Sequence, residues 1–151
     1  MRLIDDRTGL ERLEREDCLR LLASQRVGRV AVVSVGQPLI FPVNYALDGD
    51  TVVFRTAAGT KFDAAVRGAP ASFEIDSFDA LYHTGWSVVV SGRAEEVVRP
   101  DHLARLDELG LRPWASGDMS NWVAISPDHI SGRRVVDLER ARELLDDRQP
   151  N

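Results

Sequence analysis

Short runs of β-branched and apolar residues, separated by tight turns, constrain the fold of this chain more than any other feature. Residues 27–35, 39–46 and 51–56 each have the composition of a β-strand. A Gly-Gln-Pro turn at 36–38 and an Asp-Gly-Asp turn at 48–50 separate them, and Asp-Gly is a strong hairpin signal. Because parallel strands need much longer crossover connections, these strands predict an antiparallel meander.

The rest of the chain predicts three more strands, with helices between them. Ser91 and Gly92 interrupt the longest strand and indicate a bulge or a bend. The chain shows neither βαβ alternation nor the glycine-rich dinucleotide fingerprint, which argues against a doubly wound sheet. The additional strands are expected at 71–76, 86–98 and 122–126, and the helices at about 14–24, 60–67, 100–109 and 137–146.

These elements predict a mainly β fold of the α+β class, a six-stranded antiparallel barrel with flanking helices. The 151 residues suit one domain that spans 1–151, with a polar lead-in at 1–13 and a polar tail at 147–151.

Composition excludes some classes of partner and compartment. The formal net charge is −5, from 24 acidic and 19 basic residues, which does not favour nucleic acid as a partner. A single cysteine permits no internal disulfide and fits a reducing compartment. The first residues are charged, and the apolar stretches are too short to span a bilayer. We therefore expect a cytoplasmic protein without a membrane segment.

The most informative segment is the predicted strand-to-helix junction at 54–61. Arg55, Thr56, Thr60 and Lys61 place side-chain donors around a loop of small residues, where exposed backbone N–H groups also attract anions. This pattern predicts a phosphate-binding site. The alternative is a solvated junction whose threonine caps the helix.

A second candidate is the strand that contains Phe41, Pro42 and Val43. A proline removes a ladder donor, so this strand is expected at a sheet edge or at a bulge. Asn44 and Tyr45 follow, and their side chains suit a planar heterocycle. The alternative is an edge strand with an ordinary core tyrosine.

The sequence gives little support for a metal site or for a catalytic side chain. Trp86, Trp114 and Trp122 have the ordinary explanation of core or interface residues. The three histidines and one cysteine lack metal-ligand spacing, so no metal site is expected. No Ser/His/Asp arrangement identifies a catalytic side chain, and the catalytic residues are left unassigned.

The order of several motifs over residues 10–136 resembles the pyridoxamine 5′-phosphate oxidase-like split-barrel superfamily. Within it, the chain is most similar to the small flavoproteins that include the nitroimidazole-resistance-like proteins. The motifs are Val27-Gly-Arg-Val-Ala-Val, Pro42-Val-Asn-Tyr45, Phe54-Arg-Thr with Thr60-Lys61, Trp86-Ser-Val-Val-Val-Ser-Gly-Arg-Ala94 and Ile125-Ser-Pro with Ile130-Ser-Gly-Arg133.

The resemblance implies a split β-barrel that forms a homodimer, with flavin mononucleotide (FMN) at the subunit interface. The strand from Phe41 to Tyr45 would lie along the isoalloxazine ring and ribityl chain. Arg55, Thr56, Thr60 and Lys61 would hold the phosphate, and Trp86 or Trp122 of the second subunit would cover the ring.

The chain also departs from the pyridoxamine phosphate oxidases proper. Their loop usually reads Ser-Arg-Lys, whereas this chain has Gly59-Thr60-Lys61, with Arg55 as the compensating cation. Their chain end carries an Arg-x-His motif that the tail here lacks. Both differences argue against vitamin B6 oxidation itself.

The function expected from the resemblance is an FMN-dependent oxidoreductase that acts on a small electron-poor or conjugated substrate, with a nicotinamide as a possible electron donor. One alternative is a reductase that uses a deazaflavin, whose longer acidic tail would be held by Lys61, Arg67 and Arg93. A second alternative is a flavin- or haem-binding protein without enzymatic activity.

Overall fold

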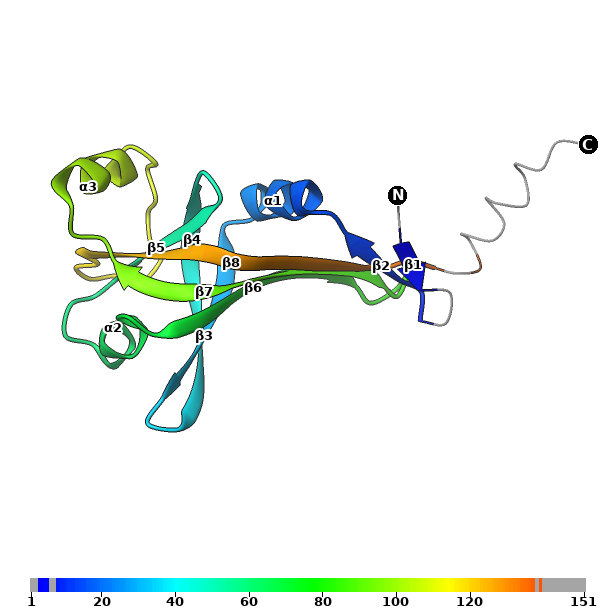
Figure 1. The fold of residues 1–151 in the computed structure, drawn as a ribbon, viewed down its shortest axis with the longest axis horizontal. Helices are drawn as coiled ribbons and strands as arrows, with labels where there is room; N and C mark the ends of the chain where they lie inside the picture. The colour runs from blue at the N-terminus through cyan, green and yellow to red at the C-terminus, as the bar shows by residue number, and fades with distance from the viewer. Residues whose placement is uncertain (1–2, 6–7, 138, 140–151) are drawn as a thin grey trace, which may run out of the picture.

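The computed structural model describes residues 3–5, 8–137 and 139. Its elements overlap every predicted strand and every predicted helix up to residue 109, and Figure 1 shows their arrangement. The strands are β1 (Leu3–Asp5), β2 (Leu10–Leu13), β3 (Val27–Ser34), β4 (Gln37–Asp48), β5 (Thr51–Thr56), β6 (Pro70–Asp79), β7 (Thr84–Glu96) and β8 (Asn121–Val135). The helices are α1 (Arg15–Ser24), α2 (Lys61–Val66) and α3 (Pro100–Asp107). The strand predicted at 122–126 is much longer than expected, because its second half pairs with β7 and β2.

Six strands close into an antiparallel ring, which confirms the predicted fold class. Their order is β8-β5-β4-β3-β6-β7, and β7 pairs back onto β8. The predicted strand count of six is wrong, because the described sheet contains eight strands. The two additional strands, β1 and β2, lie in the segment taken as a polar lead-in. β2 pairs with the last residues of β8, from Gly132 to Val135.

Three strands extend beyond the closed part of the barrel at one end. Figure 1 shows β6, β7 and β8 running side by side beyond the ring toward β1 and β2. A register shift between Ser91 and Gly92 confirms the predicted bulge. Gly92 is required there, because a Cβ would lie 2.2 Å from the backbone oxygen of Ser126. Pro127 of β8 lies opposite Gly92. A proline has no backbone N–H, and it is tolerated here because the bulge already interrupts the hydrogen bonds between β7 and β8.

The core fills the ring and extends beneath α1. Cys18 and Leu22 of α1 are fully buried, and both belong to the main apolar cluster. Gly132 of β8 permits this approach, since a Cβ there would lie 2.6 Å from the Cys18 sulfur. The predicted final helix at 137–146 and the tail at 147–151 lie outside the described residues, except for residues 137 and 139.

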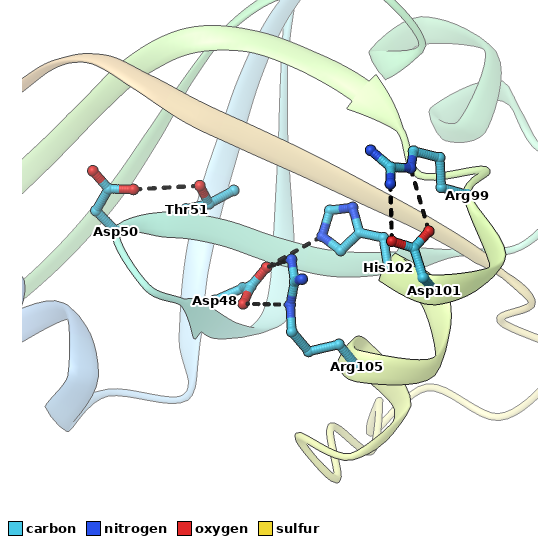
Figure 2. Close-up of polar contacts among 7 residues, drawn as sticks. All are labelled: Asp48, Asp50, Thr51, Arg99, Asp101, His102 and Arg105. Carbon is cyan, nitrogen blue, oxygen red and sulfur yellow. Dashed lines mark hydrogen bonds and ion pairs between the residues drawn. The ribbon is translucent and has the colours of Figure 1, made fainter.

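Helix α3 is clamped onto the outer face of β4, β5 and β8. Asp48 accepts two hydrogen bonds from the Arg105 guanidinium, at 2.9 and 3.2 Å, and its carboxylate lies 3.1 Å from His102 Nε2 (Figure 2). The Arg105 hydrogen bonds hold the pKa of Asp48 below its ordinary value, against the effect of burial. Beneath the helix, Leu106 packs with Trp122 in a second apolar cluster. This clamp fixes the start of the irregular segment 108–120.

No helix in the described part of the chain is long and apolar enough to cross a membrane.

Candidate functional site

Asp63 organises the junction between β5 and α2. Its side chain is 5% exposed. It accepts hydrogen bonds from Thr56 Oγ1 at 2.8 Å, Asn121 Nδ2 at 3.1 Å and the Gly59 N–H at 3.3 Å, and pairs with Arg67 at 3.0 Å. Burial alone raises the pKa of Asp63, but the hydrogen bonds and Arg67 outweigh it and lower the pKa below its ordinary value. The carboxylate therefore stays ionised and holds both ends of the loop.

Thr60 caps α2 and closes the same loop. Its hydroxyl accepts from the Asp63 N–H at 3.1 Å and donates to the Ala57 carbonyl at 2.8 Å. Gly59 has a positive φ of 75°, and a Cβ there would meet no atom within 4 Å. Asp63 was missed in the sequence, although a threonine followed three residues later by an acidic residue is the pattern of a capping box.

The hydroxyl groups of Thr56 and Thr60 both make hydrogen bonds within the junction, and their expected contact with a phosphate stays a prediction. Each hydroxyl has one hydrogen to donate. Thr56 gives its hydrogen to Asp63, and Thr60 gives its hydrogen to Ala57. Both threonines therefore stabilise the loop through internal hydrogen bonds.

Arg55 and Lys61 remain. They stand on the two sides of the loop between β5 and α2, and we call this pair the cationic corner. The Arg55 Nε atom is buried and has no hydrogen-bond partner. The guanidinium carbon lies 5.2 Å from the centre of the Trp122 ring, its cross-strand neighbour. Lys61 is exposed and makes no contact with another described polar group. Both cations thus lack an anion within the described residues.

The first part of β4 is a sheet edge, as its proline predicts. Residues 37–44 pair with β3, whereas pairing with β5 begins at Tyr45. Pro42 lies opposite Arg29 on β3, in the part with one ladder partner. Phe41 stacks on Phe62 of α2 with ring centres 4.3 Å apart, and Val43 is buried in the core. The backbone of this edge, rather than the Phe41 or Val43 side chain, is available.

Tyr45 is a core residue, and its ring is not available for stacking on a ligand. The side chain is 3% exposed, and its hydroxyl donates to the Leu22 carbonyl at 2.5 Å. Its ring packs edge-on against Phe73 at 4.7 Å. Burial raises the pKa of Tyr45 above its ordinary value, so the phenol remains a donor. The alternation of the strand turns this side chain inward and Asn44 outward.

The two tryptophans proposed to cover the ring lie in different environments. Trp122 is 3% exposed, and its indole N–H donates to Asp107 at 3.2 Å, so it is enclosed beneath α3. Trp86 is half-buried and lines a pocket of about 620 Å³ with Phe78 and Tyr82. Of the two, only Trp86 has a face that a ligand or a second copy of the chain can reach.

Trp114 is exposed in the single chain, so it is not the core residue that was one of its two expected roles, and its place at a dimer interface stays a prediction. Its side chain is 76% exposed. Its backbone N–H donates to Asn44 Oδ1 at 2.8 Å, across 70 residues of sequence. Nothing in the local pattern indicates this contact. It brings the segment after α3 against the outward-facing side of β4.

A pair of carboxyl groups lies on the outer face beside the β4 edge. Glu74 lies opposite Arg29 in the ladder, and the Arg29 guanidinium is 3.8 Å from Glu74 and 3.5 Å from Asp76. Burial, and then the hydrogen bond and charge of Asp76, raise the pKa of Glu74 to about 7, although Arg29 partly opposes them. A pKa of about 7 would leave Glu74 partly protonated at neutral pH.

This raised pKa predicts a stability that falls with pH. Because the folded-state pKa of about 7 exceeds the ordinary 4.5, the folded protein is most favoured below pH 4.5 and loses that advantage as pH rises through 7. Replacing Glu74 with glutamine should raise the free energy of unfolding at pH 8 by about 1 kcal/mol, after allowance for solvent screening. Urea unfolding at pH 8 and pH 4 measures the difference, which should vanish at the lower pH.

The exposed Glu95 on β7 provides the control. Glu95→Gln should leave the pH dependence as in the unmodified chain. If Glu74→Gln behaves like Glu95→Gln at pH 8, the pKa of Glu74 is not raised in the folded protein.

Comparison with known proteins gives matches over most of the chain. A family model described as pyridoxamine 5′-phosphate oxidase matches residues 14–134. An uncharacterized protein of Mycobacterium tuberculosis is 40% identical over 129 residues, which cover 82% of this chain and 84% of that protein.

Solved structures agree with this result. An FAD binding protein from Mycobacterium smegmatis is 35% identical, with a TM-score of 0.73 over 82% of this chain and 97% of its own. A putative pyridoxamine 5′-phosphate oxidase from Corynebacterium glutamicum is 33% identical, with a TM-score of 0.72 over 84% of this chain and 94% of its own.

Proposed function

The chain belongs to the pyridoxamine 5′-phosphate oxidase family, and from that membership we propose that it binds a flavin nucleotide and acts as an oxidoreductase. The observation that carries the proposal is the cationic corner. Arg55 has a buried Nε without a partner, which is a costly state for a polar group unless a ligand completes it. A phosphate oxygen is the acceptor that a guanidinium suits best.

The surroundings of the corner fit a phosphate group. Lys61 adds a second positive charge that no described carboxylate neutralises. Gly59 leaves open space where a side chain would stand. Asp63 is ionised, but its oxygens are occupied by Thr56, Asn121, Gly59 and Arg67, so it supports the loop without repelling an anion strongly.

The ring of the flavin would lie along the free edge of β4, from Phe41 to Asn44. Backbone groups of this edge face away from β3 and can orient a planar heterocycle. A bound flavin supplies the transfer of hydride or electrons, and the protein supplies binding, orientation and the local field. We propose a small electron-poor or conjugated compound as the substrate and a nicotinamide as the electron donor.

The corner suits the inner phosphate that FMN and FAD share. The name of the Mycobacterium smegmatis relative, an FAD binding protein at 35% identity, favours FAD over the FMN expected from the sequence. The deazaflavin alternative is less well supported, because two of its three expected cations are engaged. Arg67 pairs with Asp63 and Glu96, and Arg93 donates to the Gly68 carbonyl.

We further propose that two copies of the chain form the complete site. Large apolar side chains are exposed near the tip of the β6–β7 hairpin, with Phe78, Leu81 and Tyr82 between 63% and 79% exposed. Such side chains beside an accessible Trp86 are typical of an interaction surface. A second copy docked here would bring its own Trp86 toward a bound ring.

The test is the visible spectrum of the freshly purified protein, with mass spectrometry of the released cofactor. We expect a yellow protein that releases FMN or FAD and scatters light as a dimer of the 16.8 kDa chain. Reduction of the bound flavin by a reduced nicotinamide, and reoxidation by a nitroaromatic acceptor, would show turnover. A protein that neither retains nor rebinds any flavin contradicts the proposal, and retained flavin that never turns over removes only the enzymatic part.

A further inference from the structure

A second candidate binding site lies where the segment after α3 crosses the outer side of β4. A pocket of about 330 Å³ opens there, and its lining includes Arg26, Asn44, Arg112 and Trp114. Arg26 immediately precedes β3, and its backbone carbonyl accepts from the Tyr45 N–H at 3.1 Å. The site therefore joins the start of β3, the middle of β4 and a loop more than half a chain away.

The charge of this pocket is opposite to that of the protein. Its lining residues include two arginines and no aspartate or glutamate. Neither Arg26 nor Arg112 makes a hydrogen bond or an ion pair with another described side chain. Three other pockets lined by described residues each include at least one carboxylate, among them Asp79 and Asp128. In a chain with a net charge of −5, two arginines without partners facing one pocket indicate an anionic ligand.

The loop that builds the pocket is fixed at both ends before any ligand binds. At its start, Asp107 accepts from the Trp122 indole N–H at 3.2 Å, and Leu106 is buried under α3. At its far end, the Trp114 N–H donates to Asn44 at 2.8 Å. A pocket whose walls are already anchored loses little conformational entropy when it binds a ligand.

Trp114 adds an aromatic surface beside the two cations. Its backbone is fixed by Asn44, yet 76% of its side chain is exposed. An indole held in place and left open is a platform for another planar ring. Leu109 and Leu111 supply apolar lining around it.

We infer that this pocket binds a planar aromatic ring that carries an oxyanion, with Arg26 and Arg112 on the anion and Trp114 on the ring. Two sources share this chemistry: a free aromatic acid, and the nucleotide end of a dinucleotide. The inference goes beyond the proposed flavin site and does not depend on it, because Arg26, Arg112 and Trp114 are separate from the cationic corner. The pocket shares Asn44 with the strand proposed for the ring.

Calorimetric titration of the full chain with four probes tests the inference. The first pair is 4-nitrobenzoate and its uncharged counterpart nitrobenzene, and the second is 5′-AMP and its uncharged counterpart adenosine. In at least one pair we expect the anion to bind at least about tenfold more tightly than the neutral compound, a difference of about 1.4 kcal/mol. Preference for 4-nitrobenzoate identifies an aromatic acid, and preference for 5′-AMP identifies a nucleotide.

Variants connect the binding to the pocket. Arg26→Gln with Arg112→Gln should abolish the advantage of the anion, and Trp114→Leu should weaken the charged and the neutral member alike. Arg20→Gln with Arg99→Gln is the matched control, since both are exposed arginines on other surfaces. Thermal melts verify that each variant is folded.

Three results would overturn the inference. They are equal affinity for both members of each pair, no detectable binding of any probe at millimolar concentration, and an Arg26/Arg112 variant that binds the anion as the unmodified chain does. Each of these is independent of whether the protein carries flavin. A protein that binds the anionic probe but neither retains nor rebinds flavin would instead contradict only the proposed function.

Discussion

Replacing Arg55 and Lys61 together with alanine is expected to weaken flavin binding by about 3–6 kcal/mol, because each charge-assisted hydrogen bond contributes about 1.5–3 kcal/mol. That range corresponds to an increase in Kd of roughly 10²- to 10⁴-fold. Fluorescence titration of the flavin-free protein with FMN and with FAD measures it. The two alanines should affect both cofactors alike, since the phosphate concerned is common to both.

The same double variant should fold normally, which separates the loss of binding from loss of structure. Removing Arg55 removes a buried Nε that has no partner, so its deletion leaves no complementary group unsatisfied. The stacking of its guanidinium on Trp122 is lost, which costs about 0.5–1 kcal/mol. Arg20→Ala with Arg99→Ala removes two charges from exposed ion pairs and should leave Kd unchanged. An affinity equal to that of the control would remove the assignment of the phosphate site.

Replacing Asp63 with alanine should produce the largest loss of stability, about 3 kcal/mol. The substitution leaves Thr56, Asn121 and the Gly59 N–H without their acceptor. Thr56 is buried, and an unsatisfied buried donor costs about 1–3 kcal/mol, whereas the partly buried Asn121 and the exposed Gly59 lose less. It also removes one of the two carboxylate partners of the Arg67 guanidinium and leaves Glu96 as the other. Urea unfolding of the flavin-free protein at pH 7 measures this effect. Because the loop between β5 and α2 loses the hydrogen bonds that Asp63 accepts, the flavin affinity of the folded variant should fall as well.

The effect of Asp63 should depend on pH with a defined sign. The folded-state pKa of Asp63 is lowered from 3.8, so its contribution is present above that value and is lost as pH falls through the folded-state pKa. The difference between the unmodified chain and Asp63→Ala should therefore shrink at pH 3. Asp118→Ala, on an exposed loop, should show no difference at either pH. A constant difference from pH 7 to pH 3 would mean that the cost arises from lost packing rather than from the ionised carboxylate.

Most of the strands and helices could be predicted from the sequence because their signals are local. The two hairpin turns, the bulge at Ser91 and Gly92, and the Thr60 cap each depend on residues that are neighbours in sequence. The turns lie at 35–36 and 49–50, so the turn predicted at 36–38 is displaced, because Gln37 and Pro38 already pair with β3. The strands β1 and β2 were missed because β2 is short and owes its conformation to pairing with the end of β8. Its pattern of alternating burial becomes visible only when that partner is present.

The sequence pointed to the junction as a candidate site, but it could not show which of its side chains are paired with other residues of the chain. The sequence indicates a junction rich in donors at 55–61, and the structure leaves Arg55 and Lys61 as the donors without partners. The hydrogen bonds of Thr56 could not be predicted, because its partner Asp63 is held in place by Asn121. Asn121 lies on a strand 58 residues beyond Asp63 in the sequence.

By itself, the amino-acid pattern determined most of the antiparallel strands, the existence of their turns, the threonine cap of α2 and two cations at one junction, since each follows from near-neighbour chemistry. The tertiary structure decided which side chains are buried. In the folded chain Tyr45 lies in the core, Trp122 is enclosed beneath α3, and Trp114 is exposed while its backbone bonds to Asn44. The physical reason is that burial and pairing of a side chain depend on which distant segments pack against it, and pairings such as β5 with β8 are not encoded in either segment alone.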